Sequence, residues 1–269
     1  MDILIAVAIV AVIGAIAAVG LVLADKFMSV PTDERAAHIE KLLPGANCGA
    51  CGFSGCSGYA DAIVNSGAGP SMCSVGGADV AKAIAEYLGV EADTVEKKVS
   101  VVFCRGSNEC ASKKMDYRGI SSCKAVANQF GGTLDCRFGC IGLGDCVKAC
   151  EFGGITVRDG VAVVDTKSCV ACGQCVTACP KGLISLVPAR KTPLVLCSSR
   201  DSGAITRKAC TAGCIGCKMC EKACESDAIK VVDFRAVVDF EKCTGCGKCV
   251  AACKLGCVID FRKNCGECN

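Results

Sequence analysis

The chain has 269 residues, of which 28 are cysteine, one is histidine and none is tryptophan, and its formal net charge is +3. So small a charge, with no basic stripe of aromatic residues that could stack on bases, excludes a typical nucleic-acid-binding protein. The cysteines stand in tight C-x-x-C runs, which are typical of metal thiolates rather than of a short secreted disulfide scaffold. Zinc is an alternative, but zinc sites favour paired knuckles, whereas this chain has triple runs. Composition therefore predicts a protein that binds metal through thiolates.

Residues 1–26 are predicted to anchor the chain in a membrane. Residues 3–24 form an apolar run without charge, and at about 1.5 Å per residue a helix of this length crosses a bilayer core of about 30 Å. A cleaved signal peptide is the alternative, but no Lys or Arg precedes the run. Lys26, Arg35 and Lys41 follow it, which by the positive-inside tendency predicts a single-pass protein of the inner membrane with its remaining residues in the cytoplasm.

Residues 27–98 are predicted to form a small domain with one metal cluster. Its four cysteines are expected to bind a [4Fe-4S] cluster: Cys48, Cys51, Cys56 and Cys73. Glycines between them let the backbone approach the cluster and donate amide hydrogen bonds to its sulfurs. The segments 57–64 and 77–89 predict two short helices that close the domain.

The rest of the chain is a duplication. Nine cysteines of the first copy each have a counterpart 74 positions further on: Cys123, Cys136, Cys140, Cys146, Cys150, Cys169, Cys172, Cys175 and Cys179. Residues 155–169 and 229–243 also correspond, and each segment predicts a strand, a tight turn and a second strand. The Asp159-Gly160 pair favours a hairpin turn in the first copy. We therefore expect a first module at 99–190 and a second module at 191–269.

Three cysteine runs, at 169–179, 214–224 and 243–253, have the C-x-x-C-x-x-C-x-x-x-C spacing of bacterial ferredoxins. In such a run three thiolates bind one [4Fe-4S] cluster, and the fourth cysteine binds the other cluster of the pair. This crossing rule predicts three ligand sets: Cys150 with Cys169, Cys172 and Cys175; Cys224 with Cys243, Cys246 and Cys249; and Cys253 with Cys214, Cys217 and Cys220.

A further ligand set is incomplete. It contains three thiols: Cys140, Cys146 and the crossing Cys179. Leu143 stands where the second copy has Cys217. Cys136, four residues before Cys140, is the predicted replacement; an open-corner or three-iron cluster is the alternative. The counterpart of Cys136 is Cys210, which lies beside a complete set and weakens the idea that this position always binds metal. In total we expect at least five [4Fe-4S] clusters.

Eight cysteines are left over if Cys136 is a ligand: Cys104, Cys110, Cys123, Cys197, Cys210, Cys257, Cys265 and Cys268. They are interpreted as free or core thiols, because buried cysteine packs as a small hydrophobic residue. Cys257 aligns with the apolar Leu183, which favours packing. An additional cluster drawn from Cys104, Cys110 and Cys123 is the alternative. Residues 99–104 and 192–197 are both strand-like runs that end in cysteine.

Clusters of this kind pass single electrons. No G-x-G-x-x-G motif follows a strand, so no nicotinamide or flavin site of the Rossmann kind is predicted, and the hydride acceptor is expected on another subunit. From Lys181 onward there are fifteen Lys and Arg against nine Asp and Glu, an excess that favours an acidic electron donor. Solvated charges without a partner are the alternative interpretation.

The order of an apolar N-terminal helix, the NCGACGFSGC segment with Cys73, and tandem ferredoxin-like modules resembles the B subunit of Rnf-type ion-translocating ferredoxin:NAD oxidoreductases. The resemblance implies an α+β chain with an N-terminal transmembrane helix, a small [4Fe-4S] domain and two tandem bacterial-ferredoxin-like dicluster modules. It also implies a cytoplasmic arm that accepts electrons from reduced ferredoxin. The other subunits of the complex would then reduce NAD and move Na+ or H+ across the lipid bilayer.

An anchored polyferredoxin that serves a hydrogenase or a redox-sensor-reducing system is the alternative function. The chain also departs from the ferredoxin pattern, because the proline that usually follows the last cysteine of a run is present only as Pro180. Glu151, Glu225 and Lys254 stand at the other three positions. Since this proline shapes the turn, the departure concerns local geometry more than metal binding.

Overall fold

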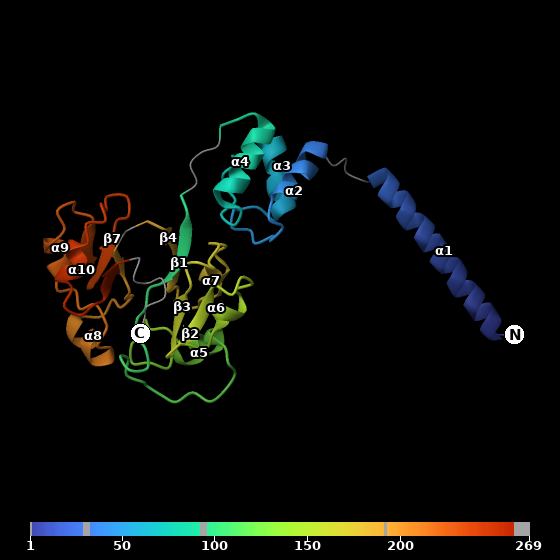
Figure 1. Ribbon diagram of the computed structural model, residues 1–269. Coiled ribbons are helices and arrows are strands. Elements are labelled where there is room, and N and C mark those ends of the chain that lie inside the picture. The colour runs from blue at the N-terminus through green and yellow to red at the C-terminus, as the bar shows by residue number, and fades with distance from the viewer. Residues whose placement is uncertain (1, 29–32, 92–95, 191–192, 261–269) are drawn as a thin grey trace.

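The computed structural model describes residues 2–28, 33–91, 96–190 and 193–260. Figure 1 shows a separate N-terminal helix, a small helical domain and two modules that contain both strands and helices. All of the strands lie in short antiparallel pairs, so the described part of the chain is an α+β protein. Cys265 and Cys268 lie outside the described residues.

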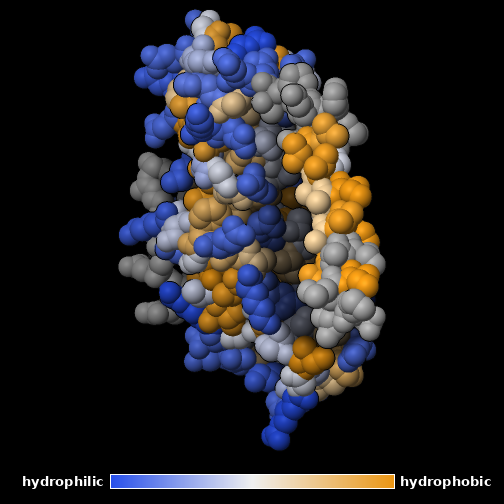
Figure 2. All heavy atoms as spheres, turned by 90° about the vertical axis from the view of Figure 1, so that its right-hand side faces the viewer, coloured by the Kyte–Doolittle hydropathy of each residue, from blue (hydrophilic) through white to orange (hydrophobic). Residues whose placement is uncertain are grey.

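The N-terminal helix α1 spans Asp2–Met28. Among its described side chains, Val12, Ile16 and Leu21 are 58%, 66% and 72% exposed. Figure 2 shows a column of hydrophobic side chains beside a body whose visible surface is largely hydrophilic. Within the part of the chain that the structure describes, no helix meets the combined length and hydropathy required to cross a membrane.

The small domain consists of three helices around an apolar core. They are α2 (Glu34–Leu42), α3 (Cys56–Ser66) and α4 (Gly77–Leu88). The two helices predicted from the sequence correspond to α3 and α4 and are confirmed. Ile39, Tyr59 and Ile84 are almost fully buried between them. The three helices therefore form a core that supports the cysteine loop before α3.

The first module contains four strands and three short helices. In chain order they are β1 (Lys98–Val102), α5 (Cys123–Phe130), α6 (Asp145–Lys148), β2 (Ile155–Arg158), β3 (Val161–Val164), α7 (Gln174–Ala178) and β4 (Ile184–Pro188). β1 pairs with β4, and β2 pairs with β3, both antiparallel. Asp159 and Gly160 have φ values of +47° and +79°, as a type I′ hairpin requires. The predicted hairpin is confirmed.

The second module repeats this order of elements. They are β5 (Pro193–Val195), α8 (Gly203–Ala209), α9 (Met219–Lys222), β6 (Ile229–Val232), β7 (Arg235–Val238), α10 (Lys248–Ala252) and β8 (Val258–Asp260). β5 pairs with β8, and the predicted second hairpin is confirmed by the pairing of β6 with β7. The modules differ mainly in the connection from the first strand to the first helix, which covers residues 103–122 in the first module and 196–202 in the second.

The two modules pack closely against each other. Leu194 and Leu196 of the second module share an apolar core with Val99, Val101 and Val187 of the first. Hydrogen bonds also cross the boundary next to the end of β1. Arg105 Nη1 donates to the carbonyl oxygen of Gly256 at 2.7 Å, and Ser198 Oγ donates to that of Phe103 at 2.9 Å. These contacts fix the position of one module against the other, so side chains from both modules can contribute to one site.

Candidate metal centres

The cysteines lie in groups within and between the domains. All 26 described cysteines are free thiols, from Cys48 to Cys257. Among the described residues, no group of three or more His, Cys, Asp or Glu side chains is arranged to hold a single metal ion. In a [4Fe-4S] cluster, by contrast, each of the four thiolates binds a different iron, so the thiols stand further apart around a larger space.

The Cys169 site is a hollow of about 320 Å³, counting the open space at its mouth. It is lined by the four cysteines predicted for this set: Cys150, Cys169, Cys172 and Cys175. The backbone N–H of Ser100 donates to Cys169 Sγ at 3.4 Å, and Cys175 Sγ donates to Ser100 Oγ at 3.3 Å. Apolar Ile155 and Val164 complete the wall. Hydrogen bonds to sulfur of this kind adjust the potential of a bound cluster.

The Cys243 site is the matching hollow of the second module, with a volume of about 300 Å³ on the same measure. It is lined by the second predicted set: Cys224, Cys243, Cys246 and Cys249. The N–H of Ala228 donates to Cys224 Sγ at 3.3 Å. Cys249 is buried, whereas Cys246 is exposed. This site therefore opens to the surface of the second module.

The Cys140 site contains the three cysteines of the incomplete set together with a fourth cysteine. Its hollow of about 400 Å³ is lined by four cysteines: Cys123, Cys140, Cys146 and Cys179. Cys136 does not line it and lies in another hollow, which favours Cys123 over Cys136 as the fourth thiol of this set. Cys123 reaches this place because α5, which begins at that residue, packs against Leu143 and Ile141. A leucine at position 143 thus supports the helix that carries the substitute thiol.

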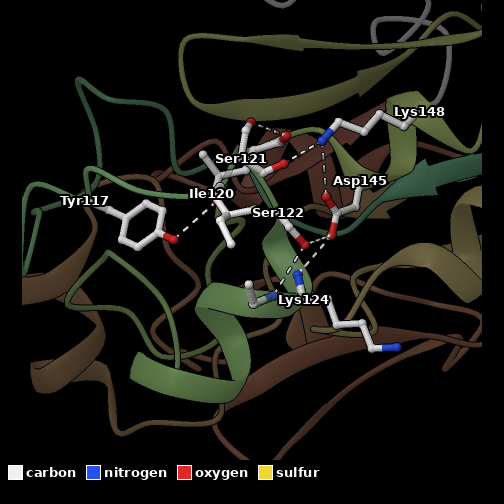
Figure 3. A network of polar contacts seen from close by, with 9 residues as sticks. Tyr117, Ile120, Ser121, Ser122, Lys124, Asp145 and Lys148 are labelled. Atoms are coloured by element: carbon white, nitrogen blue, oxygen red, sulfur yellow. Dashed lines mark hydrogen bonds and ion pairs between the residues drawn. The ribbon is translucent and has the colours of Figure 1, made fainter.

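A carboxylate holds the beginning of α5 in position. Asp145 Oδ2 accepts hydrogen bonds from Ser122 Oγ at 3.0 Å and from the N–H of Lys124 at 2.9 Å (Figure 3). Lys148 extends toward the same carboxylate and donates to the carbonyl oxygen of Ser121. Partial burial raises the pKa of Asp145, but the hydrogen bonds from Lys124 and Ser122 outweigh it and hold the pKa below its usual value. The residues on both sides of Cys123 are thereby tied to the residue before Cys146.

Proximity of the thiols in the Cys140 site has an electrostatic consequence. Burial, followed by the neighbouring Cys140, Cys123 and Cys179, raises the pKa of Cys146 to about 12. Four adjacent thiolates repel one another unless cations lie between them. Iron bound at this site would supply those cations and displace the thiol protons.

The Cys214 site comprises the third predicted set: Cys214, Cys217, Cys220 and Cys253. Cys214, Cys220 and Cys253 share one apolar cluster with Cys257, whereas Cys217 is exposed. The sulfurs of Cys253 and Cys257 are 3.5 Å apart. The neighbouring Cys257 thiol lowers the pKa of both Cys214 and Cys253, because its single proton can be donated to either sulfur. Cys257 therefore packs against the thiols of this site, in agreement with its interpretation as a core residue.

The Cys48 site lies in the small domain and comprises Cys48, Cys51, Cys56 and Cys73. The last three pack against the same helical core. The N–H of Gly76 donates to Cys73 Sγ at 3.3 Å, and Asn47 Oδ1 accepts from the N–H of Cys56 at 2.8 Å. The main-chain oxygen of Cys48 accepts a hydrogen bond of 3.0 Å from Gln174 Nε2 of α7. The small domain thus meets the first module beside Cys172, the ligand candidate two residues before Gln174.

A fourth cysteine-lined hollow lies between the two modules and was not predicted as a set. Its cysteines are Cys104, Cys136, Cys197 and Cys210. We call it the bridging site. Of the three cysteines considered for an additional cluster, Cys104 lines the bridging site and Cys123 lines the Cys140 site. Cys110 lines neither of these hollows, nor those of the Cys169 and Cys243 sites.

Comparisons with known proteins identify the chain's family. Residues 43–75 match the family described as "Putative Fe-S cluster", and residues 136–183 and 213–257 match the "4Fe-4S dicluster domain" family. The B subunit of the ion-translocating oxidoreductase complex of Methanosarcina acetivorans is 42% identical over 248 residues, which cover 92% of this chain and 94% of that protein. The chain belongs to this family. The resemblance inferred from the cysteine pattern is thereby confirmed.

Two further relatives carry names that specify the reaction of their complex. The B subunit of the Na(+)-translocating ferredoxin:NAD(+) oxidoreductase complex of Acetobacterium woodii is 42% identical over 95% of this chain and 77% of its own length. The B subunit of the proton-translocating ferredoxin:NAD(+) oxidoreductase complex of Clostridium ljungdahlii is 41% identical over 89% of this chain and 86% of its own length. As a member of this family, the chain is an electron-transfer subunit that carries several [4Fe-4S] clusters.

Two features of the sites were not predicted from the sequence. They are the pairing of Cys104 with Cys197 and the position of Cys123 in the Cys140 site. The gapless offset of 74 residues pairs Cys123 with Cys197, but the topology pairs Cys104 with Cys197, because each follows the first strand of its module by two residues. The signal that could have shown this is the strand-like run that ends in Cys104 and in Cys197. Cys123 instead follows the connection that is longer in the first module, as the first residue of α5.

Proposed function

We propose that this chain accepts electrons from reduced ferredoxin and relays them singly to a membrane complex that reduces NAD+ and translocates Na+ or H+. The names of the Acetobacterium woodii and Clostridium ljungdahlii relatives support this assignment. These names specify different ions, and the proposal includes both. The observation that carries the proposal is the succession of four-thiol sites from the small domain to the second module.

The ligand sets that we propose for five [4Fe-4S] clusters follow the sites described above. They are Cys48, Cys51, Cys56 and Cys73; Cys150, Cys169, Cys172 and Cys175; Cys123, Cys140, Cys146 and Cys179; Cys214, Cys217, Cys220 and Cys253; and Cys224, Cys243, Cys246 and Cys249. Each bound cluster supplies a one-electron redox centre. The chain holds these centres in order, shields them with apolar walls and donates hydrogen bonds to their sulfurs.

Contacts between neighbouring sites support a continuous route. The hydrogen bond from Gln174 to Cys48 places the small domain against the loop that carries Cys172. Within the first module, α6 ends just before Cys150 of the Cys169 site and carries Cys146 of the Cys140 site. α7 likewise carries Cys175 of one site and ends at Cys179 of the other. The crossing pattern thus ties neighbouring sites to the same short helices.

We place the ferredoxin-binding surface on the second module. Cys217 and Cys246 are exposed there, so two sites approach the surface of the protein. Lys218 and Lys222 are exposed next to the Cys217 loop. Positive charge beside an exposed centre would attract an acidic electron donor and shorten the distance over which the electron passes.

We further propose that α1 anchors the chain in the inner membrane, with the cluster domains on the cytoplasmic side. The uncharged run at 3–24 and the exposed apolar side chains of Val12, Ile16 and Leu21 support this role. The proposed domain organisation is the anchor at 1–26, the small domain at 27–98 and the modules at 99–190 and 191–269. The small domain would then lie between the membrane and the modules.

Stopped-flow mixing of the full, anaerobically purified chain with reduced ferredoxin tests the proposal. We expect rapid loss of the visible absorption of the oxidised clusters, with a rate that falls as salt is added. Lys218→Glu with Lys222→Glu should lower the second-order rate about tenfold. Lys113→Glu with Lys114→Glu, on the first module, is the matched control and should leave the rate unchanged. Absence of any electron transfer from ferredoxin to the unmodified chain would refute the proposal.

A further inference from the structure

The bridging site is assembled from equivalent parts of the two modules. Cys104 and Cys197 each lie two residues after the first strand of their module. Cys136 and Cys210 each lie four residues before a cysteine of the next site and have the offset of 74 residues. Each module therefore contributes one thiol after its first strand and one thiol before its cluster loop.

Hydrogen bonding repeats this equivalence. The N–H of Cys140 donates to Cys104 Sγ at 3.4 Å, and the backbone N–H of Cys214 lies next to the sulfur of Cys197. Main-chain turns fix the other two thiols, because Gly139 N–H donates to the carbonyl oxygen of Cys136 and Gly213 N–H donates to that of Cys210. Two matched pairs of thiols, one pair from each module, thus line one hollow.

The size and lining of the hollow match those of the sites already described. Its volume is about 380 Å³, compared with about 400, 320 and 300 Å³ at the Cys140, Cys169 and Cys243 sites. Leu134, Phe138 and Leu196 contribute apolar walls. A β-bridge between Ala111 and Cys210 and an ion pair of 2.7 Å between Arg137 and Asp201 close the module boundary around it. The all-sulfur donor set fits a [4Fe-4S] cluster.

We propose that Cys104, Cys136, Cys197 and Cys210 bind a further [4Fe-4S] cluster that connects the two modules. This inference rests on the proposed function for its role as a relay, but the binding itself does not depend on the identity of the electron donor. One electron passes from a reduced centre in one module to the bridging cluster, which is reduced by one electron and is reoxidised when that electron passes to the other module. No proton or covalent bond is transferred.

The hydrogen bonds of the bridging site also give it a defined place in the route. Cys104 is joined by one hydrogen bond to Cys140, a ligand candidate of the first module. Cys197 lies next to the backbone N–H of Cys214, a ligand candidate of the second module. The bridging site is therefore adjacent to one centre on each side. Without it, the route between modules would have to cross the whole boundary in one step.

Iron and acid-labile sulfide analysis of the full chain tests the binding. Cys104→Ser and Cys197→Ser, which alter one thiol from each module, should each remove about four iron and four sulfide atoms per chain and one electron paramagnetic resonance (EPR) signal. Cys110→Ser is the matched control, because this nearby cysteine does not line the hollow. Unchanged iron in both bridging variants, or one zinc ion per chain lost in place of iron, would overturn the proposal.

A second measurement does not require a variant to fold. Alkylation of the unmodified chain under anaerobic conditions, followed by peptide mapping, should leave all four bridging cysteines unlabelled until a chelator and an oxidant remove the clusters. Cys110 should be labelled from the start. Labelling of Cys104 and Cys136 in the fully loaded chain would contradict the inference.

Measuring how fast each module is reduced distinguishes a bridging cluster that does not relay electrons from a chain that does not accept electrons from ferredoxin. After mixing with reduced ferredoxin, the Cys197→Ser variant should still be reduced rapidly in the second module, whereas reduction of the first module should slow at least tenfold. Equal rates in both modules would overturn the relay role. Absence of reduction even in the unmodified chain would instead refute ferredoxin as the donor, and iron analysis would still decide whether the bridging cluster exists.

Discussion

The side-chain amide of Gln174 donates a hydrogen bond of 3.0 Å to the main-chain oxygen of Cys48. This contact joins the small domain to α7 of the first module and places the Cys48 site beside the Cys169 site. Because Gln174 lies in the cysteine run itself, a residue between two ligand candidates also sets the position of the neighbouring domain.

Replacement of Gln174 by leucine should weaken this contact, since a hydrogen bond of this kind contributes about 1 kcal/mol. We expect all clusters to be retained and electron transfer between the Cys169 and Cys48 sites to slow severalfold. Rapid freeze-quench EPR measures that step. Thr177→Ala is the control, because the Thr177 hydroxyl donates within α7, to the carbonyl oxygen of Gln174. Equal transfer rates in the two variants would show that the contact is unimportant.

The assignment of Cys123 and Cys136 to different sites predicts additive losses. Cys123→Ser and Cys136→Ser should each remove about four iron atoms, and the double variant should remove about eight. Iron and sulfide analysis with EPR distinguishes this from the sequence-based expectation, in which Cys136 completes the Cys140 site. If both residues served one cluster, the double variant would lose no more iron than a single variant.

Removal of the Asp145 carboxylate should loosen the Cys140 site without removing a metal ligand. Asp145→Ala leaves the N–H of Lys124 and the hydroxyl of Ser122 without their acceptor, and loss of such a cap costs about 1 kcal/mol. We expect nearly full iron content but faster loss of one cluster to a chelator, with partial recovery in Asp145→Asn. Asp116→Ala, an exposed carboxylate before α5, should behave as the unmodified chain. A uniform acceleration at every cluster would contradict a local role for Asp145.

Gly142 and Gly216 have positive φ values of +78° and +66°, and each packs its backbone against a hairpin turn. A Cβ atom at Gly216 would lie 2.7 Å from the carbonyl oxygen of Phe234, and one at Gly142 would clash with that of Gly160. Alanine at either position should therefore destabilise the module by more than the ~1 kcal/mol typical of positive φ alone. The rate at which the clusters lose their visible absorption in a fixed concentration of guanidinium measures this destabilisation. Gly182→Ala isolates the contribution of φ, because Gly182 has a φ of +59° and a Cβ there would meet no atom within 4 Å.

Local patterns predicted α3 and α4 of the small domain, both hairpins and the grouping of the Cys169 and Cys243 sites, because short-range spacing decides these features. The Cys140 site could not be completed in this way. Its fourth thiol lies on α5, whose position depends on the packing of Leu143 and on the carboxylate of Asp145. A cysteine that is distant in sequence can take the place of a missing cysteine when the packing of its helix brings it to the same site.

The bridging site could not be predicted from the sequence for a related reason. Its thiols come from two modules, so no run of the sequence contains them. The constant offset of 74 residues also aligned Cys197 with Cys123, whereas the longer connection at 103–122 makes Cys104 its structural counterpart. Only the packing of β1 and β5 at the boundary brings Cys104 and Cys197 to one hollow.

The most direct test of the account is the order in which the sites are reduced. The full chain would be mixed anaerobically with a substoichiometric amount of reduced ferredoxin, frozen after successive millisecond delays and studied by EPR, with the cysteine variants used to assign each signal. The account predicts that signals from the second module rise first, followed by those of the first module and then by that of the Cys48 site. Simultaneous rise of all signals, or reduction of the Cys48 site before the second module, would contradict a relay that runs from the second module to the small domain.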